Sequence, residues 1–354
     1  MNRNHAIDLW KFVCALCLIL YHFKQVLGSH VADTYYDLIM YFNLVVEWFF
    51  MISGYMVCVS DDKWFKTAPS DKPEERRFLY RFKRLYPMFF IATVAAAVIM
   101  YVYKSVTGVW WWEEGMQHGI FNLIISLTCM TYTGIFSPDP IVGVNSPTWF
   151  MDALILCYMI YYLIRLISRK KNISPVWLYA FVMLLGFYAW YQMTTIPFLN
   201  KDMGRGYAAF FLGCFIHELA GYFEKKKMQV FTIVAAAVFV LLRLLGYADD
   251  MYFIIAYVEG ALLLLFFTQF DFPSKILGFI PGTAAMGGAS FEIFLWHLPV
   301  MNLMALVWHL TGRTEYKLPD FALYTICVLA VSFLMYFLVE KKLLSGKTGN
   351  SNKK

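Results

Sequence analysis

Apolar segments of about twenty residues recur along almost the whole chain, which is 354 residues long. A helix that crosses a bilayer needs about 20 mostly apolar residues, and the sequence predicts ten such helices. Their expected ranges are 8–28, 38–60, 85–103, 148–168, 175–193, 205–223, 229–246, 252–270, 288–310 and 321–340. Hydrophobic residues make up 60% of the chain and charged residues 15%, whereas soluble domains average roughly 45–50% and about 25%. We therefore expect an all-α polytopic membrane protein, and the same values exclude a disordered chain, a coiled coil and a disulfide scaffold.

The basic residues decide whether an eleventh apolar segment, 118–136, also crosses the membrane. Lys and Arg concentrate in the cytoplasmic loops of membrane proteins. If the N-terminus is cytoplasmic and 118–136 does not cross, the clusters 169–171 and 225–227 lie on the same side as the basic link 61–84. We therefore expect 118–136 to be a re-entrant or interfacial helix on the outer side. The prediction is a multi-pass protein of the plasma (inner) membrane with both termini cytoplasmic.

The chain is expected to form one transmembrane domain, 1–344, followed by a disordered cytoplasmic tail, 345–354. The seven cysteines lie almost all inside apolar segments and form no C-x-x-C pair, so we interpret them as packing residues and expect no metal site. The net charge of +6 is concentrated in the links between apolar segments. This placement indicates membrane topology and argues against a nucleic-acid partner.

The first apolar segment carries three ionisable residues, Asp8, Lys11 and His22. Asp8 and Lys11 are three residues apart and can form an ion pair on one helix face. Lys11 and His22 are eleven apart, so they share a face at a separation of about 16 Å along the axis. Ionisable residues inside a membrane suggest a function. The alternative is a snorkelling lysine and a histidine that only packs.

Two further groups of polar residues lie in the second and third segments. Glu47 is expected at a membrane depth similar to that of His22, and Ser53 precedes a glycine in a pattern typical of close helix packing. Arg81 and Arg84 share a helix face where the third segment begins. They serve either orientation and anionic lipid binding or the binding of a phosphate by guanidinium groups.

Four residues in later segments are candidates for contacting a substrate: Trp149, Asp152, Arg205 and Glu259. Trp149 also fits an interfacial anchor, and Arg205 fits a helix-end charge. Glu259 lies within its segment and needs a buried partner. His297 is also intramembrane, and Pro299 predicts a kink in the helix beside its imidazole.

Five of these motifs, in this order, resemble the acyltransferase-three family of bacterial integral-membrane acyltransferases. They are Asp8, Lys11 and His22; Glu47, Phe49, Phe50, Ser53 and Gly54; Arg81, Arg84, Tyr86 and Pro87; Pro147 and Trp149; and Ser290, Phe291, His297 and Pro299. Each motif is weak alone, but their order and the ten-segment topology together favour the family. One departure is Lys11, where the family usually has arginine. The hydrolase-like domain that follows the last span in some members is not expected here.

The resemblance implies transfer of an acyl group, most often acetyl, from cytoplasmic acyl-CoA to a hydroxyl of a cell-envelope polysaccharide or its lipid-linked precursor. It implies acetyl-CoA as co-substrate, a lipid bilayer and a glycan acceptor as partners, and no metal. The donor would contact Lys11, Arg81, Arg84 and Ser53, and the acceptor would contact Trp149, Asp152, Arg205 and Glu259.

In this interpretation His22 is the general base and Glu47 fixes its tautomer. His297 either lines the acceptor side or stabilises the oxyanion. Transfer is either direct or passes through an acyl-enzyme on Ser53 or His22.

Two other functions are compatible with intramembrane acids and histidines. A proton-coupled transporter or a lipid-linked-sugar flippase would use them as a proton relay. Such proteins commonly have paired, interrupted helices in their two halves, and the sequence has no corresponding segments. A membrane O-acyltransferase of the unrelated type with an Asn/His pair would share the reaction but not the spacing from Lys11 to His22.

Overall fold

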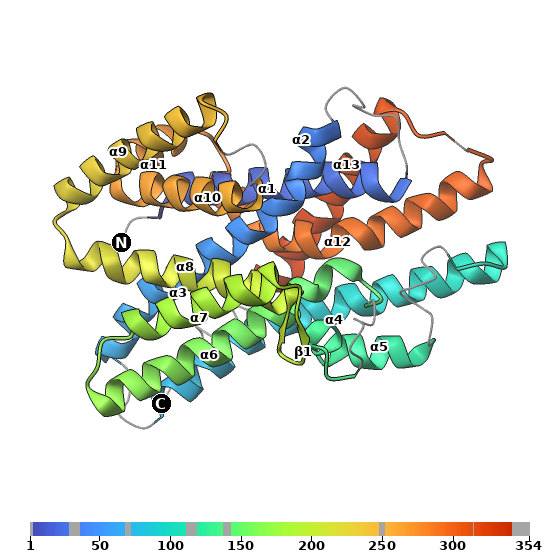
Figure 1. Ribbon diagram of the computed structural model, residues 1–354. Helices are drawn as coiled ribbons and strands as arrows, with labels where there is room; N and C mark the ends of the chain where they lie inside the picture. Colours follow the sequence, from blue (N-terminus) through green and yellow to red (C-terminus); the bar gives the residue numbers. More distant parts are fainter. Residues whose placement is uncertain are drawn as a thin grey trace, which may run out of the picture.

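The fold is almost entirely helical in the computed structural model, which describes residues 3–27, 36–67, 72–110, 119–136, 143–247, 252–313 and 315–341 (Figure 1). The first half contains α1 (His5–Leu27), α2 (Tyr36–Tyr41), η2 (Phe42–Leu44), α3 (Val45–Thr67), α4 (Pro73–Thr107), α5 (Ile120–Leu127), η4 (Thr131–Thr133), η5 (Ser146–Thr148), α6 (Trp149–Lys171) and α7 (Val176–Tyr191). A short antiparallel hairpin, β1 (Thr195–Ile196) and β2 (Leu199–Asn200), follows. The second half contains α8 (Lys201–Tyr222), α9 (Lys225–Leu244), α10 (Tyr252–Gln269), α11 (Phe272–Leu277), α12 (Thr283–Leu310), α13 (Leu318–Met335) and the π-helical turn η6 (Tyr336–Glu340). The predicted tail, 345–354, lies outside the described residues.

Each of the ten predicted segments coincides with a helix, and the all-α membrane architecture is confirmed. Within the described parts of the chain, seven helices are long and apolar enough to cross a bilayer, and two apolar helices, Val176–Tyr191 and Ile254–Gln269, are shorter. The predicted segment that remains, 205–223, corresponds to α8, which has 22 residues but carries charged residues in its first turns. The total of ten spans therefore stays a prediction.

In the described part of the eleventh segment, the α-helix is the short α5 of eight residues, followed by the single turn η4. At 1.5 Å per residue α5 is about 12 Å long, far less than the roughly 30 Å of a hydrocarbon core. Left-handed backbone at Cys129 (φ 56°) and Gly134 (φ 80°) turns the chain soon after it. The Ser126 hydroxyl accepts a hydrogen bond from the amide of Val144 at 3.1 Å, which ties α5 to the chain before α6. As predicted, this segment is too short to cross the membrane as a helix.

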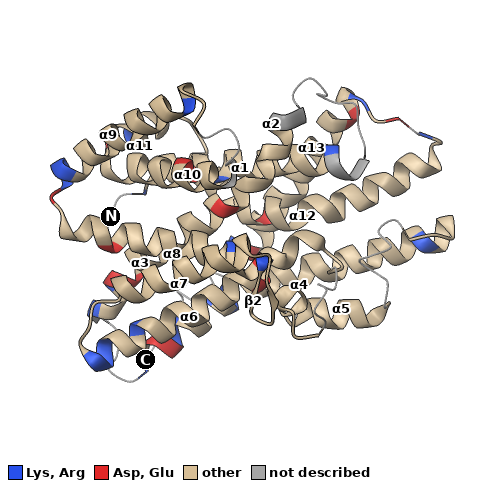
Figure 2. Cartoon of the chain, in the orientation of Figure 1, with Lys and Arg blue, Asp and Glu red and all other residues tan. Residues whose placement is uncertain are grey.

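Most of the clustered basic residues lie at one end of the bundle, which we call the basic end. Figure 2 shows Lys and Arg at the end of α6 and at the start of α9. Ion pairs join the helix ends there: Arg169 with Glu74 at 2.7 Å, Arg165 with Glu218 at 3.6 Å, and Lys225 with Asp271 at 2.8 Å. The ends of α6, α8 and α10 and the starts of α4, α9 and α11 are therefore together, which is the grouping of links that the charge pattern predicted.

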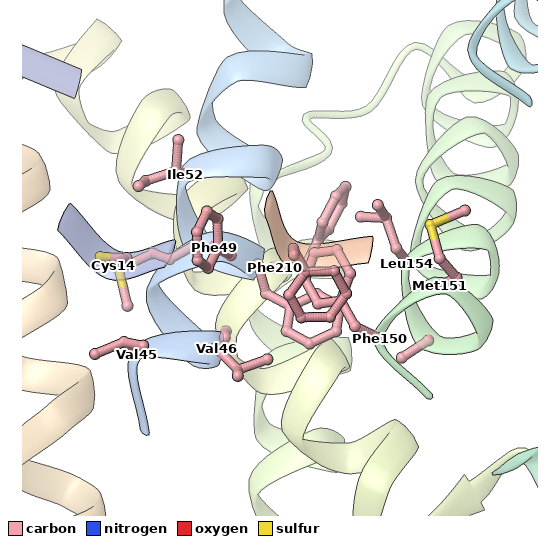
Figure 3. Packing of buried hydrophobic residues seen from close by; sticks show 14 of the residues in the cluster. Cys14, Val45, Val46, Phe49, Ile52, Phe150, Met151, Leu154 and Phe210 are labelled. Carbon is pink, nitrogen blue, oxygen red and sulfur yellow. The ribbon is translucent and has the colours of Figure 1, made fainter. Parts of the chain in front are cut away.

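The centre of the bundle depends on close contact between α3 and α8. A Cβ added to Gly54 would lie 1.9 Å from the carbonyl oxygen of Phe210, and one added to Gly213 would lie 2.0 Å from that of Met51. These glycines let the two backbones touch, which stabilises helix pairs in a membrane. Figure 3 shows the apolar side chains of α1, α3, α6 and α8 that meet around this contact, among them Phe49.

Glycine substitutions on α8 test this packing. Gly213→Ala should destabilise the protein by at least the roughly 1–3 kcal/mol typical of an overpacked core, because the new methyl group meets backbone that cannot move aside. Gly221→Ala, near the end of the same helix, is the control, since an added Cβ there meets nothing within 4 Å. Thermal unfolding in one detergent measures both, and equal unfolding temperatures would contradict the proposed helix contact.

Candidate functional site

The contact between α1 and α12 brings together two histidines that are far apart in the sequence. The rings of His22 and His297 lie with their centroids 5.0 Å apart and their planes tilted by 32°. Nearer the basic end, Gly287 lets the same two helices approach, since a Cβ there would lie 2.4 Å from the Cβ of Asp8. Helix α1 therefore packs along much of its length against α12, which carries the last of the five motifs (Figure 1).

The buried ring of His297 has a tautomer fixed by its surroundings. Its Nδ1 lies 2.7 Å from the carbonyl oxygen of Phe294. Because a carbonyl can only accept, Nδ1 carries the proton and donates it, so Nε2 of the neutral ring has a lone pair. That Nε2 is buried and has no hydrogen-bond partner among the described residues. His297 therefore presents a proton acceptor beside the ring of His22.

Pro299 leaves one backbone carbonyl of α12 without its usual donor, and Asn145 supplies a replacement. In a regular helix the amide of residue 299 would donate to the carbonyl of Leu295, but proline has no N–H. The Nδ2 of Asn145 donates to this carbonyl at 3.0 Å. Asn145 immediately precedes η5, so the bond joins that segment to α12 two residues from His297.

Glu47, which the sequence suggested as the partner of His22, forms an ion pair with Arg205. Arg205 Nε donates to Glu47 Oε1 at 2.6 Å, and both side chains are buried. The other carboxylate oxygen, Oε2, has no hydrogen-bond partner among the described residues. The guanidinium group also lies over the ring of Trp149, 4.7 Å from its centroid. A buried guanidinium group is always charged and requires a counter-charge, whereas an imidazole can stay neutral. This difference explains why Glu47 pairs with Arg205.

His22 and Trp149 line a cavity of about 270 Å³ that we call the histidine pocket. Its remaining lining residues are Leu18, Tyr21, Asn43, Val46, Ser146, Pro147, Phe294 and Leu298. It lies beside the last turns of α1, away from the basic end. The structure thus brings together His22, His297, Trp149, Arg205 and Glu47, all predicted from the sequence as site residues.

Two predicted substrate residues lie outside the histidine pocket and have other partners. Asp152 accepts a hydrogen bond from the amide of Tyr132 at 2.8 Å, which fixes η4 against α6. Glu259 accepts one from the hydroxyl of the half-buried Tyr41 at 2.6 Å, which is a partner for the carboxylate within the helix bundle. Both geometries indicate support for the fold around the pocket and give no contact with its interior.

Lys11 lines a second cavity, of about 360 Å³, that we call the lysine pocket. It lies near the basic end, and its other lining residues are Arg3, Asn4, Ile7, Asp8, Tyr55, Met56, Val59 and Thr268. The predicted ion pair is present, with Lys11 Nζ 3.2 Å from Asp8 Oδ1. Asp8 also accepts from Arg3 at 2.5 Å, so one carboxylate faces two cations.

An apolar layer separates the two pockets. On α1 the buried Cys14 lies between Lys11 of one pocket and Leu18 of the other, and on α3 Phe49 and Ile52 are among the buried residues between Val46 and Tyr55 (Figure 3). The seven residues from Lys11 to Leu18 correspond to a separation of about 10 Å along the helix.

The two arginines predicted as a phosphate clamp belong to different networks. Arg81 donates to Asp61 at 2.9 Å and to the Tyr162 hydroxyl at 2.7 Å, so it faces α3 and α6. Arg84 donates to Glu340 at 3.2 Å and is half-exposed. Their spacing places Arg81 and Arg84 on one face of α4, but the two guanidinium groups bind different carboxylates and do not form one phosphate site. Ser53 is half-buried and lines neither pocket.

Three polar residues of this region were not identified from the sequence as site residues. Asn43 and Ser146 line the histidine pocket, and Asp61 is a fully buried carboxylate that organises Arg81. Asp61 lies near the end of its apolar segment, so it looked like an ordinary loop charge. For Asn145, the one available signal was the proline at 299, which predicts an unpaired carbonyl but not its donor.

These features define a multi-pass membrane protein. The histidine pocket and the lysine pocket lie toward opposite ends of its helix bundle, and the pair of histidines is at the former. The acyltransferase-three family model, described as an acyltransferase domain, matches residues 4–337. The chain therefore belongs to this family and is a membrane acyltransferase, as its motifs predicted. Comparisons with curated proteins and with solved structures found no match.

A double-mutant cycle tests the link between Asn145 and the kink of α12. Asn145→Ala leaves the Leu295 carbonyl buried without a donor, which should cost about 1–3 kcal/mol of unfolding free energy. In a Pro299→Ala background the restored backbone N–H can pair with this carbonyl, so Asn145→Ala should cost less. We expect a coupling of about 0.5–3 kcal/mol from unfolding of the four proteins; purely additive effects would show that Asn145 does not serve this carbonyl.

Proposed function

We propose that this acyltransferase moves an acetyl group from cytoplasmic acetyl-CoA to a hydroxyl of a cell-envelope polysaccharide or its lipid-linked precursor. The basic end would face the cytoplasm, with both chain termini on that side of the plasma membrane. The concentration of Lys and Arg at this end supports the orientation. The observation that carries the proposal is the pair of histidines at a pocket toward the opposite end, with a cation-bearing pocket nearer the donor's side.

The donor would approach through the lysine pocket. Arg3 and Lys11 share one carboxylate there, Asp8, so the pocket keeps a positive balance that suits the phosphates of a CoA thioester. The thioester would then extend past Cys14 and Phe49 toward His22. This requires the apolar layer to open, and a pantetheine arm is narrow and flexible enough to pass between such side chains.

The chemical step follows from which histidine faces the acceptor. His22 lines the histidine pocket, so in our proposal it is the general base. Its imidazole takes the hydroxyl proton as the acceptor oxygen bonds to the thioester carbon. The carbon–sulfur bond then breaks, and the CoA thiolate takes the proton from His22 and leaves as a free thiol. Because Ser53 lines neither pocket, we propose direct transfer without an acyl-serine.

His297 takes the role that the sequence had suggested for Glu47. Its unpaired Nε2 beside His22 can accept a hydrogen bond from the imidazolium that forms during the reaction. The neutral tautomer has no Nε2 proton, so His297 is suited to stabilising this cation and not to donating to an oxyanion. Trp149, held by Arg205, provides a flat wall on which a sugar ring can pack.

Removal of His22 tests the proposed base. His22→Ala should lower acyl transfer by about 10²–10⁴-fold, the usual contribution of general base catalysis, while membrane insertion and the unfolding temperature persist. Mass spectrometry of envelope glycans from a deletion strain complemented with each variant measures the lost acyl increment. Normal acylation with His22→Ala would remove the base assignment. Unaltered glycans in the deletion strain itself would refute the proposed acceptor.

The tautomer of His297 gives a second test with a matched pair of variants. His297→Asn keeps a donor near the Phe294 carbonyl but lacks the Nε2 lone pair, whereas His297→Gln places polar atoms nearer the Nε2 position. We expect His297→Asn to be folded and inactive, and His297→Gln to be less stable but more active per folded molecule. Unfolding temperatures and acylation rates of the two proteins decide this, and the reverse order of activity would contradict the proposed role.

A further inference from the structure

A larger cavity, of about 790 Å³, opens at the basic end directly beside the lysine pocket. We call it the surface pocket, and its lining residues are Arg3, Asn4, His5, Phe267, Thr268, Phe270, Asp271, Ser274, Lys275, Gly278 and Phe279. Three of these, Arg3, Asn4 and Thr268, also line the lysine pocket, so the two cavities adjoin. Both volumes fall in the range of roughly 300–1,000 Å³ that is typical of small-molecule sites.

Specific hydrogen bonds hold the walls of the surface pocket in place. The Nδ2 of Asn4 donates to the Phe267 carbonyl at 2.7 Å, and its Oδ1 caps the start of α1 by accepting from the amide of Ala6 at 3.1 Å. The ring of His5 is 2.8 Å from the hydroxyl of Thr283. The beginning of α1 is thus attached to the end of α10 and to the start of α12, and the pocket needs little ordering when a ligand binds.

The charges of the surface pocket favour an anionic ligand. Its only carboxylate among the described residues, Asp271, pairs with Lys225 at 2.8 Å, and Lys225 is not part of the lining. Lys275 forms no ion pair with any described residue, and Arg3 is half-exposed beside it in the lining. The lining therefore carries two cationic side chains, Lys275 and Arg3, and one carboxylate that is already held by Lys225.

Aromatic side chains border the same cavity. Phe279 is 86% exposed, and Phe270 lines the cavity with it. Flat apolar surfaces in the same cavity as the cations Lys275 and Arg3 match a ligand that carries both a planar base and phosphates. Asn4 and Thr268 line both cavities, so the surface pocket continues into the lysine pocket with a width that suits a pantetheine arm.

We propose that the surface pocket binds the nucleotide of the acyl-CoA donor, with its phosphates on Lys275 and Arg3 and its adenine against Phe279. The pantetheine arm passes Asn4 into the lysine pocket and points the thioester toward Lys11. This assignment rests on the proposed function and deepens it. It places the phosphates between the starts of α1 and α11, in a cavity whose lining does not include Arg81 or Arg84.

Binding of CoA to the purified protein in phosphatidylcholine nanodiscs tests the assignment. Lys275→Ala should weaken CoA binding about tenfold, the usual effect of losing one charge-assisted contact, and Phe279→Ala should weaken it by a similar or smaller factor. Neither variant should change the affinity for pantetheine, which lacks the nucleotide. Lys226→Ala is the control, because Lys226 is exposed at the same end and lines neither pocket.

The outcomes separate this inference from the proposed function. Wild-type CoA affinity in Lys275→Ala and Phe279→Ala, with acyl transfer intact, would overturn the nucleotide site but leave the function standing. Failure of the wild-type protein to bind CoA or to transfer an acyl group would refute both. The same CoA titrations in nanodiscs that contain phosphatidylglycerol distinguish a lipid phosphate from the nucleotide. If this lipid removes the difference in CoA affinity between the wild type and Lys275→Ala, and added CoA does not restore it, the site binds lipid phosphate and the nucleotide assignment is wrong.

Discussion

The contact of His22 with His297 is the interaction on which the rest of the site depends. The two rings belong to α1 and α12, and the approach of these helices at Gly287 sets their distance. The Phe294 carbonyl fixes one ring so that its lone pair is directed into the protein. Two histidines in this relation can share one proton, which is the proton that an acyl transfer from a thioester to a hydroxyl must move.

Several buried polar groups around this pair have specific partners, which a membrane interior favours. Arg205 has Glu47, and Asn145 serves the carbonyl that Pro299 leaves unpaired. An unpaired buried group costs about 1–3 kcal/mol, and His297 Nε2, Glu47 Oε2 and Asn145 Oδ1 have no hydrogen-bond partner among the described residues. Of these atoms, His297 Nε2 belongs to the ring that lies beside His22, where we propose the proton transfer.

The sequence could predict whatever depends on neighbours along one helix. The apolar lengths predicted all ten helices, the charge pattern predicted the basic end, and the spacing of Asp8 and Lys11 predicted their ion pair. It could not predict contacts that depend on how far each helix rotates about its axis. Arg81 and Arg84 share a face by spacing, but rotation of α4 directs Arg81 to Asp61. The pairing of Glu47 with Arg205 joins residues 158 positions apart, and no local pattern predicts that they meet.

The proposed mechanism requires the thioester to reach the histidine pair from the lysine pocket. A structure of the protein with a non-transferable acetyl-CoA analogue, in which a methylene group replaces the sulfur, measures this directly. We expect the analogue's carbonyl carbon beyond the apolar layer, next to the histidine pocket, with room for an acceptor hydroxyl about 3–3.5 Å away and within reach of His22. A carbonyl carbon held on the other side of Phe49, with that layer still closed, would contradict the claim.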